Sequence, residues 1–374
     1  MSPLSRLCAF PWDLADDPAA GDRAAATGAS GVAIAASYHS VRAATPLHPL
    51  TKIVDARTAA FYLPVRDEAW AGSRLIPVSA ADWAGENSFV RAADAARASG
   101  LAAEAWVVLT HSSVLGTANP DLCVRNAAGE IYPYALCPSA ADVREYAVRV
   151  ATETVLLSGV TTVMVEACGP MGVGHLGHHE KTSGADWSST DEALLSICFC
   201  AHCQAALKNL GADPVAVAAQ VFAAIGQGYP SVEDALGGTA ALVLEVRDTS
   251  RRALAEAVTA AARAAGATEL LFHTQTDPWA TGPFAALVDT PGVADGLIFP
   301  VSDLGLTGQP RTVPALADGV RVGGYVPLLP PADPDRFVQD SADALRGLDD
   351  LYLYHFGLLS RRRLDTVTEL IAAL

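Results

Sequence analysis

Short apolar runs alternate with longer alanine-rich stretches of helical periodicity along most of this 374-residue chain. Apolar runs of roughly four to eight residues are typical of strands that are buried on both faces of a parallel sheet. We count eight such runs, at Leu7–Phe10, Gly31–Ala36, Ala103–Leu109, Thr161–Val165, Glu269–His273, Gly296–Phe299, Val320–Val326 and Leu351–Phe356. Eight alternating strand and helix units predict an α/β protein of the (β/α)8 TIM barrel class, with a doubly wound open sheet as the alternative.

The alanine-rich stretches predict the helices that surround the strands. They span Phe89–Ser99, Ala140–Leu157, Asp191–Leu210, Thr249–Ala265, Asp333–Leu348 and Arg363–Leu374, and Asp248 is expected to cap the fourth. The chain is predicted to be a single barrel domain, 1–374, with long insertions after strands two and four at residues 38–102 and 168–268. Loops that follow barrel strands lie on the catalytic face, so both insertions are expected to wall an active site.

The charge balance narrows the classes of partner. With 41 acidic and 25 basic residues the net charge is −16, which disfavours nucleic acid and anionic membranes as partners. No apolar run is long enough for a signal-peptide core or a membrane-spanning helix, and the seven cysteines are an odd number. We therefore expect a cytoplasmic protein with reduced thiols and a small-molecule carbohydrate substrate. The alanine-rich helices are compatible with a homo-oligomer.

Cysteines form the densest chemical motif in the chain. Three of them, Cys198, Cys200 and Cys203, have the spacing C-x-C-x-x-C. Thiolates at this spacing suit a closed tetrahedral Zn²⁺ site, which needs a fourth ligand from elsewhere. Cys137, just before a proline, can supply it, and Cys123 and Cys168 are the alternatives. The prediction is a structural zinc ion, weighed against the reading that the thiols are ordinary small core residues.

Acidic residues lie at the carboxyl ends of several predicted strands, where TIM barrels carry out their chemistry. Glu166 ends the fourth run, and a carboxylate at that position is costly to bury without a partner or a function. Asp277 follows the fifth run directly before Pro278, where it could also organise a turn. Asp13 follows the first run, where capping a helix is the simpler interpretation.

Aromatic and histidine side chains share these strand ends. A sugar ring needs aromatic faces for its C–H groups and polar groups for its hydroxyls, so this enrichment favours a carbohydrate site. A single histidine at a strand end is more commonly structural. The predicted substrate-binding residues are Trp12, Tyr38, His39, His111, His179, Lys181, His273, Gln275, Tyr325, Tyr354 and His355. His179 and Lys181 belong to a Gly- and His-rich loop, residues 169–187, that is expected to cover the pocket.

The order of three motifs resembles glycoside hydrolase family 42 β-galactosidases and related putative glycoside hydrolase barrels. These motifs are Leu136-Cys137-Pro138-Ser139, the strand that ends in Glu166, and Cys198-Phe199-Cys200-Ala201-His202-Cys203. The resemblance implies a TIM barrel with Glu166 as general acid/base and with Cys137, Cys198, Cys200 and Cys203 as ligands of one structural zinc ion. The chain departs from the family at Val165, where the family has Asn, and at strand seven, which has Tyr325 and no acid.

These observations predict a glycoside hydrolase that acts on a small glycoside or oligosaccharide. Hydrolysis of this kind uses two carboxylates, and we assign Glu166 as the general acid/base and Asp277 as its partner. Two other classes stay open. One is a non-hydrolytic sugar-active enzyme, a lyase or isomerase, with or without a divalent metal. The other is a catalytically inactive carbohydrate-binding relative.

Overall fold

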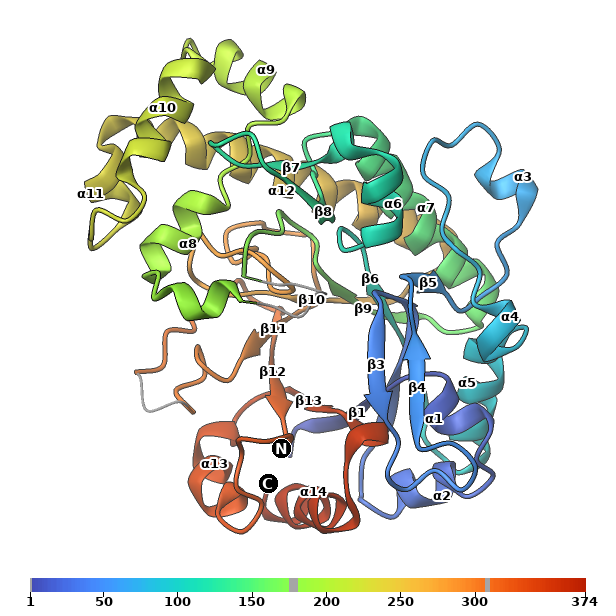
Figure 1. Ribbon diagram of the computed structural model, residues 1–374. Coiled ribbons are helices and arrows are strands. Elements are labelled where there is room, and N and C mark those ends of the chain that lie inside the picture. Colours follow the sequence, from blue (N-terminus) through green and yellow to red (C-terminus); the bar gives the residue numbers. More distant parts are fainter. Residues whose placement is uncertain (1, 175–180, 307–309) are drawn as a thin grey trace.

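Eight parallel strands close into a barrel at the centre of the molecule (Figure 1). The computed structural model describes residues 2–174, 181–306 and 310–374. Strand β1 pairs with both β2 and β13, and this closes the cylinder. The barrel strands are β1 (Leu4–Ala9), β2 (Gly31–Tyr38), β6 (Ala102–Val108), β9 (Thr162–Glu166), β10 (Glu269–His273), β11 (Gly296–Pro300), β12 (Arg321–Pro327) and β13 (Asp350–Tyr354). Each overlaps one of the eight apolar runs, so the predicted (β/α)8 barrel is confirmed.

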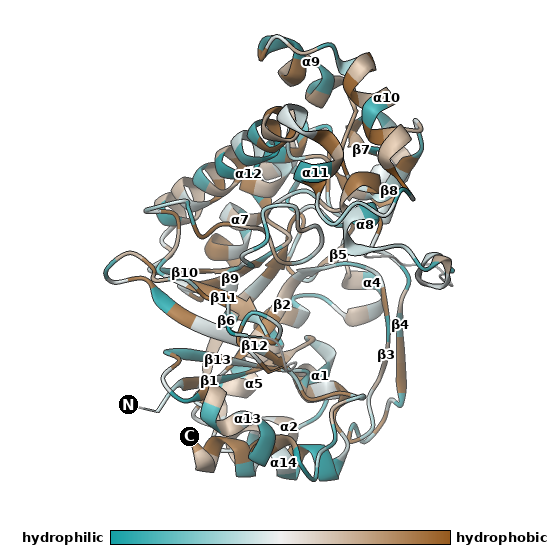
Figure 2. Cartoon of the chain, turned by 90° about the vertical axis from the view of Figure 1, so that its left-hand side faces the viewer, coloured by the Kyte–Doolittle hydropathy of each residue, from teal (hydrophilic) through white to brown (hydrophobic). Residues whose placement is uncertain are grey.

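Helices pack around the outside of the barrel. They are α2 (Ala20–Ala25), α5 (Ser88–Ala98), α7 (Ala141–Ser158), α12 (Gly238–Ala265), α13 (Phe337–Leu345) and α14 (Arg361–Ala373). Figure 2 shows hydrophobic and hydrophilic segments alternating along α12 and α14, as expected for helices with one buried face. Within the described ranges no helix follows β10 or β11, so the outer ring is incomplete there. None of the described helices is both long and apolar enough to span a membrane.

The insertion after β2 adds small elements to one side of the barrel. Strands β3 (Val41–Ala44) and β4 (Ile53–Ala56) form an antiparallel hairpin. Strand β5 (Ala60–Phe61) pairs antiparallel with β2, and the short helices α1 (Trp12–Ala15), α3 (Asp67–Trp70) and α4 (Ala81–Ala84) complete this side (Figure 1).

The segment after β6 holds a second hairpin that the sequence did not predict. It consists of β7 (Cys123–Arg125) and β8 (Ile131–Leu136), and α6 (Ser113–Ala118) precedes it. The insertion after β9 is helical, with α8 (Ser189–Leu195), α9 (Ala201–Asn209), α10 (Pro214–Ala224) and α11 (Val232–Leu236). These four helices lie on the opposite side of the molecule from α13 and α14 in both views (Figures 1 and 2).

Three predicted helices differ from the observed ones. The helix expected at Asp333–Leu348 is shorter and spans Phe337–Leu345. The helix expected at Asp191–Leu210 is interrupted between α8 and α9, and Cys198 and Cys200 lie in the interruption. The helix expected to begin at Thr249 begins at Gly238 instead, so Asp248 does not cap it. Asp248 lies inside α12, where its carboxylate pairs with Arg251 at 2.8 Å.

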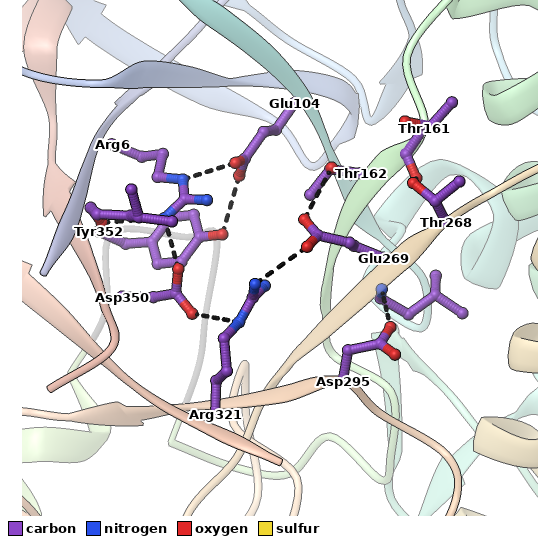
Figure 3. Close-up of polar contacts among 12 residues, drawn as sticks. Arg6, Glu104, Thr161, Thr162, Thr268, Glu269, Asp295, Arg321, Asp350 and Tyr352 are labelled. Carbon is purple, nitrogen blue, oxygen red and sulfur yellow. Dashed lines mark hydrogen bonds and ion pairs between the residues drawn. The ribbon is translucent and has the colours of Figure 1, made fainter. Parts of the chain in front are cut away.

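A buried ionic network fills the amino-terminal end of the barrel (Figure 3). Arg6 pairs with Glu104 and Asp350, while Arg321 bridges Asp350 at 2.9 Å and Glu269 at 3.0 Å. A buried charge is tolerated when it is paired, and each of these five side chains has an ion-pair partner. The network occupies the strand starts, a position in TIM barrels that serves stability. Candidate chemistry is therefore to be found at the opposite, carboxyl end.

Candidate active site and cysteine cluster

Glu166 is the last residue of β9, at the carboxyl end of the barrel. Its side chain is buried, and its Oε2 accepts a hydrogen bond of 2.8 Å from the indole Nε1 of Trp106 on β6. Burial raises the pKa of Glu166 to about 8, because removal from water penalises the charged form, and the indole hydrogen bond offsets only part of this. The carboxyl group is therefore mostly protonated at neutral pH.

His273 ends the neighbouring strand, β10, and faces Glu166. Its Nδ1 lies 3.7 Å from Glu166 Oε2, and neither ring nitrogen has a hydrogen-bond partner among the described residues. Burial lowers the pKa of His273 to about 3, so the imidazole is neutral. The ring stacks on Phe284 with centroids 4.7 Å apart and meets Tyr325 edge-on at 5.1 Å. These contacts fix the ring plane, and the side chain is 1% exposed.

Three tyrosines complete the surroundings of Glu166. Tyr325 and Tyr354, on β12 and β13, have ring centroids 5.3 Å apart, and Tyr38 on β2 meets Trp106 edge-on at 4.8 Å. Burial raises the pKa of all three phenols, and the nearby carboxyl of Glu166 adds to the rise. Four of the residues predicted to bind substrate, together with Glu166, thus form one cluster.

A second pair of carboxyl and imidazole groups lies where β1 and β13 end. Asp13 Oδ2 accepts a hydrogen bond of 2.8 Å from the backbone N–H of Phe10 and lies 3.7 Å from Nδ1 of His355. Burial raises the pKa of Asp13 to about 7 and lowers that of His355 to about 3. Neither ring nitrogen of His355 has a hydrogen-bond partner among the residues the structure describes. A Cβ at Gly357 would lie 2.0 Å from Asp13 Oδ1, so this position requires glycine.

Other predicted residues adjoin this centre through aromatic contacts. His39 stacks on Tyr38 with ring centroids 4.2 Å apart, and Trp12 stacks on Phe10, which lies 4.9 Å from Tyr38. His39 stacks on His111 with centroids 4.4 Å apart, and its Nδ1 contacts the carbonyl oxygen of Ser40 at 2.8 Å. Trp12 is buried in an aromatic group, 5.9 Å from Tyr62 and 5.5 Å from Trp83.

The loop after β10 carries two more of the predicted residues. Gln275 donates to the carbonyl oxygen of Phe284 at 2.9 Å. Asp277 is exposed, and its Oδ1 accepts a hydrogen bond of 2.9 Å from the backbone N–H of Trp279. It therefore organises its own turn, and its role as second carboxylate stays a prediction. Lys181 is exposed, and His179 lies outside the described residues.

Sequence reasoning missed Trp106 and gave Asp13 little weight. Trp106 lies inside β6 rather than at its end. Side chains alternate along a strand, so Trp106 lies on the same face of β6 as Val108, two residues further along. Asp13 was assigned to helix capping, yet α1 has no side-chain cap and Asp13 accepts from Phe10 instead.

Four cysteines meet between the β7–β8 hairpin and the insertion after β9. The Sγ atom of Cys137, just after β8, lies 3.8 Å from that of Cys198 and 3.6 Å from those of Cys200 and Cys203. All four Sγ atoms lie within 4.8 Å of one another. A tetrahedral site with Zn–S bonds of about 2.3 Å has sulfur atoms about 3.8 Å apart, so the spacing and the donor set fit zinc.

The alternative fourth ligand, Cys123, lies outside this group. Its Sγ contacts the carbonyl oxygen of Gly116 at 3.4 Å.

No protein-family model matches the sequence, and no curated protein sequence matches it. Solved structures do resemble the fold. The α-L-fucosidase isoenzyme 2 of Paenibacillus thiaminolyticus superposes with a TM-score of 0.57 at 10% identity, over 99% of this chain and 49% of that chain. The chain thus spans about half the length of that fucosidase.

Two further structures show the same barrel. The catalytic domain of β-amylase from Paenibacillus polymyxa has a TM-score of 0.57 at 12% identity, with 100% of each chain covered. The β-galactosidase of Marinomonas ef1 has a TM-score of 0.55 at 10% identity, over 98% of this chain and 59% of that chain. Identities this low establish a shared fold, and activity has to be argued from the site.

Proposed function

We propose that this protein is a glycoside hydrolase that acts on a small glycoside or oligosaccharide, with Glu166 as the general acid. The observation that carries the proposal is the buried carboxyl of Glu166 at the carboxyl end of a barrel strand, hydrogen-bonded to Trp106. A general acid must hold its proton at working pH and give it to the leaving oxygen as the glycosidic bond breaks. A raised pKa of about 8 meets the first condition.

The groups around Glu166 support a carbohydrate ligand. The rings of Tyr325 and Tyr354 are partly exposed and provide aromatic surface for the C–H groups of a sugar. The unpartnered ring nitrogens of His273 and His355 are buried, and each can accept or donate one hydrogen bond to a hydroxyl group. Buried polar atoms without partners are uncommon in folded proteins, and bound ligand hydroxyls would satisfy them.

Glycoside hydrolysis also needs a second carboxylate, which acts on the sugar or on the attacking water molecule. Asp277, the partner predicted from the sequence, is exposed and accepts a bond within its own turn. Asp13 fits the role better, because it is buried at a strand end beside His355 and has a pKa near 7. A base with this pKa takes up a proton from an attacking water molecule near neutral pH. We propose Asp13 as that base and Glu166 as the acid.

We also propose that Cys137, Cys198, Cys200 and Cys203 hold one structural zinc ion. The support is the donor set and the sulfur spacing, which match a closed tetrathiolate site with no open position for substrate. Bound there, zinc would fasten the β7–β8 hairpin to the interruption between α8 and α9. This role is structural, and no chemical step passes through the metal.

A glycan screen tests the hydrolase proposal. Purified protein is incubated with aryl glycosides and oligosaccharides of varied sugar and linkage, and released products are measured by chromatography. We expect release with at least one class and a loss of at least about a thousandfold in kcat for Glu166→Gln, in the range of removing an acid catalyst. Sugar binding without release from any substrate would instead support a non-catalytic carbohydrate-binding protein.

A further inference from the structure

Arg247 is a buried cation that forms no ion pair within the described residues. It lies on α12 and is 7% exposed. Its Nη2 donates to the carbonyl oxygens of Trp279 at 3.1 Å and Ala280 at 2.9 Å, while its Nε has no partner in the described part of the chain. Burial lowers the pKa of Arg247 to about 10, which still leaves it charged at neutral pH. Two carbonyl groups compensate a buried guanidinium only in part.

Arg251, one turn further along α12, provides the contrast. It is buried to a similar degree, with 5% exposure, but its guanidinium pairs with Asp248 at 2.8 Å. The two arginines therefore share a helix and a degree of burial, and they differ in whether a carboxylate forms a direct ion pair with them.

The cysteine cluster lies on the other side of a small cavity from this helix. Arg247 lines the cavity of about 20 Å³ together with Cys137, Cys198 and Cys203, and Arg251 is not part of its lining. This volume is close to that of a single water molecule. Burial and Arg251 lower the pKa of Arg247, while Asp248, Asp277 and Cys203 act in the direction that favours the cation.

Four thiolates and one Zn²⁺ ion carry a net charge of −2, because four negative charges exceed the two positive charges of the metal. We infer that Arg247 is the electrostatic partner of this centre: it neutralises part of the zinc tetrathiolate charge and ties it to the loop after β10. Groups just outside a metal site that neutralise or orient its ligands change metal affinity by about 10- to 100-fold. The inference rests on the proposed zinc ion and does not depend on glycosidase activity.

Zinc release measures this role directly. Purified wild type, Arg247→Met, Arg247→Lys and the matched control Arg251→Met are first assayed for zinc content. The rate of zinc transfer to excess colorimetric chelator is then recorded for each. We expect about one zinc ion per chain in wild type, release at least about tenfold faster in Arg247→Met, and release close to wild type in Arg251→Met. Arg247→Lys keeps the charge and is expected to lie nearer to wild type.

Replacing the zinc ion by Co²⁺ gives an absorption spectrum that a purely structural role for Arg247 would not change. A positive charge beside the sulfur atoms stabilises their electrons, so its removal should move the thiolate-to-Co²⁺ charge-transfer band of the substituted protein to longer wavelength. The Lys variant should restore the band. If Arg247→Met does not fold, Arg247→Gln replaces it in both measurements.

The outcomes distinguish the zinc proposal from the proposed role of Arg247. Wild-type protein with far less than one zinc ion would overturn the zinc proposal and the inference together. Stoichiometric zinc with equal release rates and an unmoved cobalt band in the uncharged Arg247 variant would overturn the role of Arg247 alone. Faster release in Arg251→Met to the same extent would also overturn it, because the effect would then follow from any loss of a buried arginine.

Discussion

Replacing Glu166 by glutamine is predicted to make the protein more stable at alkaline pH, although it removes the proposed acid. In the folded protein the carboxyl has a pKa of about 8, compared with about 4.3 for a free glutamate side chain. Between these values the folded state keeps a proton that the unfolded state releases. Raising the pH therefore favours unfolding, and this stability is present below pH 4 and lost as the pH rises to 8.

The size of the effect follows from the pKa difference. Each pKa unit corresponds to about 1.4 kcal/mol, so the penalty grows from about 1 kcal/mol at pH 5 to about 4 to 5 kcal/mol at pH 8. Glutamine does not ionise, and its side-chain oxygen can still accept the hydrogen bond from Trp106. The free energy of unfolding of Glu166→Gln relative to wild type should therefore rise by about 3 to 4 kcal/mol over this range.

Urea denaturation at pH 5, 6, 7 and 8 measures this difference without any substrate. Asp277→Asn is the control, because its side chain is exposed and should give a nearly constant difference from wild type. A Glu166→Gln curve that runs parallel to the wild-type curve, within about 1 kcal/mol, would contradict the raised pKa. The argument that Glu166 is protonated at neutral pH would then fail with it.

Three further predictions concern the same end of the barrel. Trp106→Phe removes the hydrogen bond that favours the ionised form of Glu166, so the alkaline limb of the pH profile of kcat/KM should move up by about one unit. In steady-state kinetics on one substrate, Asp13→Asn should lower kcat at least about a hundredfold, while Asp277→Asn should stay within a few-fold of wild type. A larger loss in Asp277→Asn than in Asp13→Asn would assign the base to Asp277 instead. Gly357→Ala introduces a Cβ 2.0 Å from Asp13 and should cost about 1 to 3 kcal/mol in urea denaturation, whereas an unchanged midpoint would show that the contact relaxes freely.

The barrel strands could be predicted from the sequence because burial on both faces requires a short, uninterrupted run of apolar residues. Runs such as Gly31–Ala36 hold no charged residue, and the observed β2 is buried at every position. The β7–β8 hairpin has no such apolar run, because β8 contains Pro133 and its first residues are only partly buried. Short, half-exposed strands resemble loops in composition, and their pairing depends on contacts distant in the chain.

The candidate site was predictable where one residue type carries a large energetic cost. Glu166 was found because an acid at the end of an apolar strand is expensive to bury, and the cysteine spacing points to metal chemistry by itself. The contributions of Asp13 and Arg247 could not be predicted. They depend on which side chains meet across the barrel mouth and along α12, and the sequence separations involved, such as Asp13 to His355, carry no local signal.

Leaving-group dependence tests the central claim most directly. The claim is that Glu166 donates a proton to the departing oxygen, which matters little for a leaving group that departs as a stable anion. With a sugar identified by the screen, Glu166→Gln should slow hydrolysis of an oligosaccharide or alkyl glycoside by about a thousandfold or more, and that of the dinitrophenyl glycoside far less. Equal losses for both substrates, or no loss for either, would contradict the role of Glu166 as the general acid.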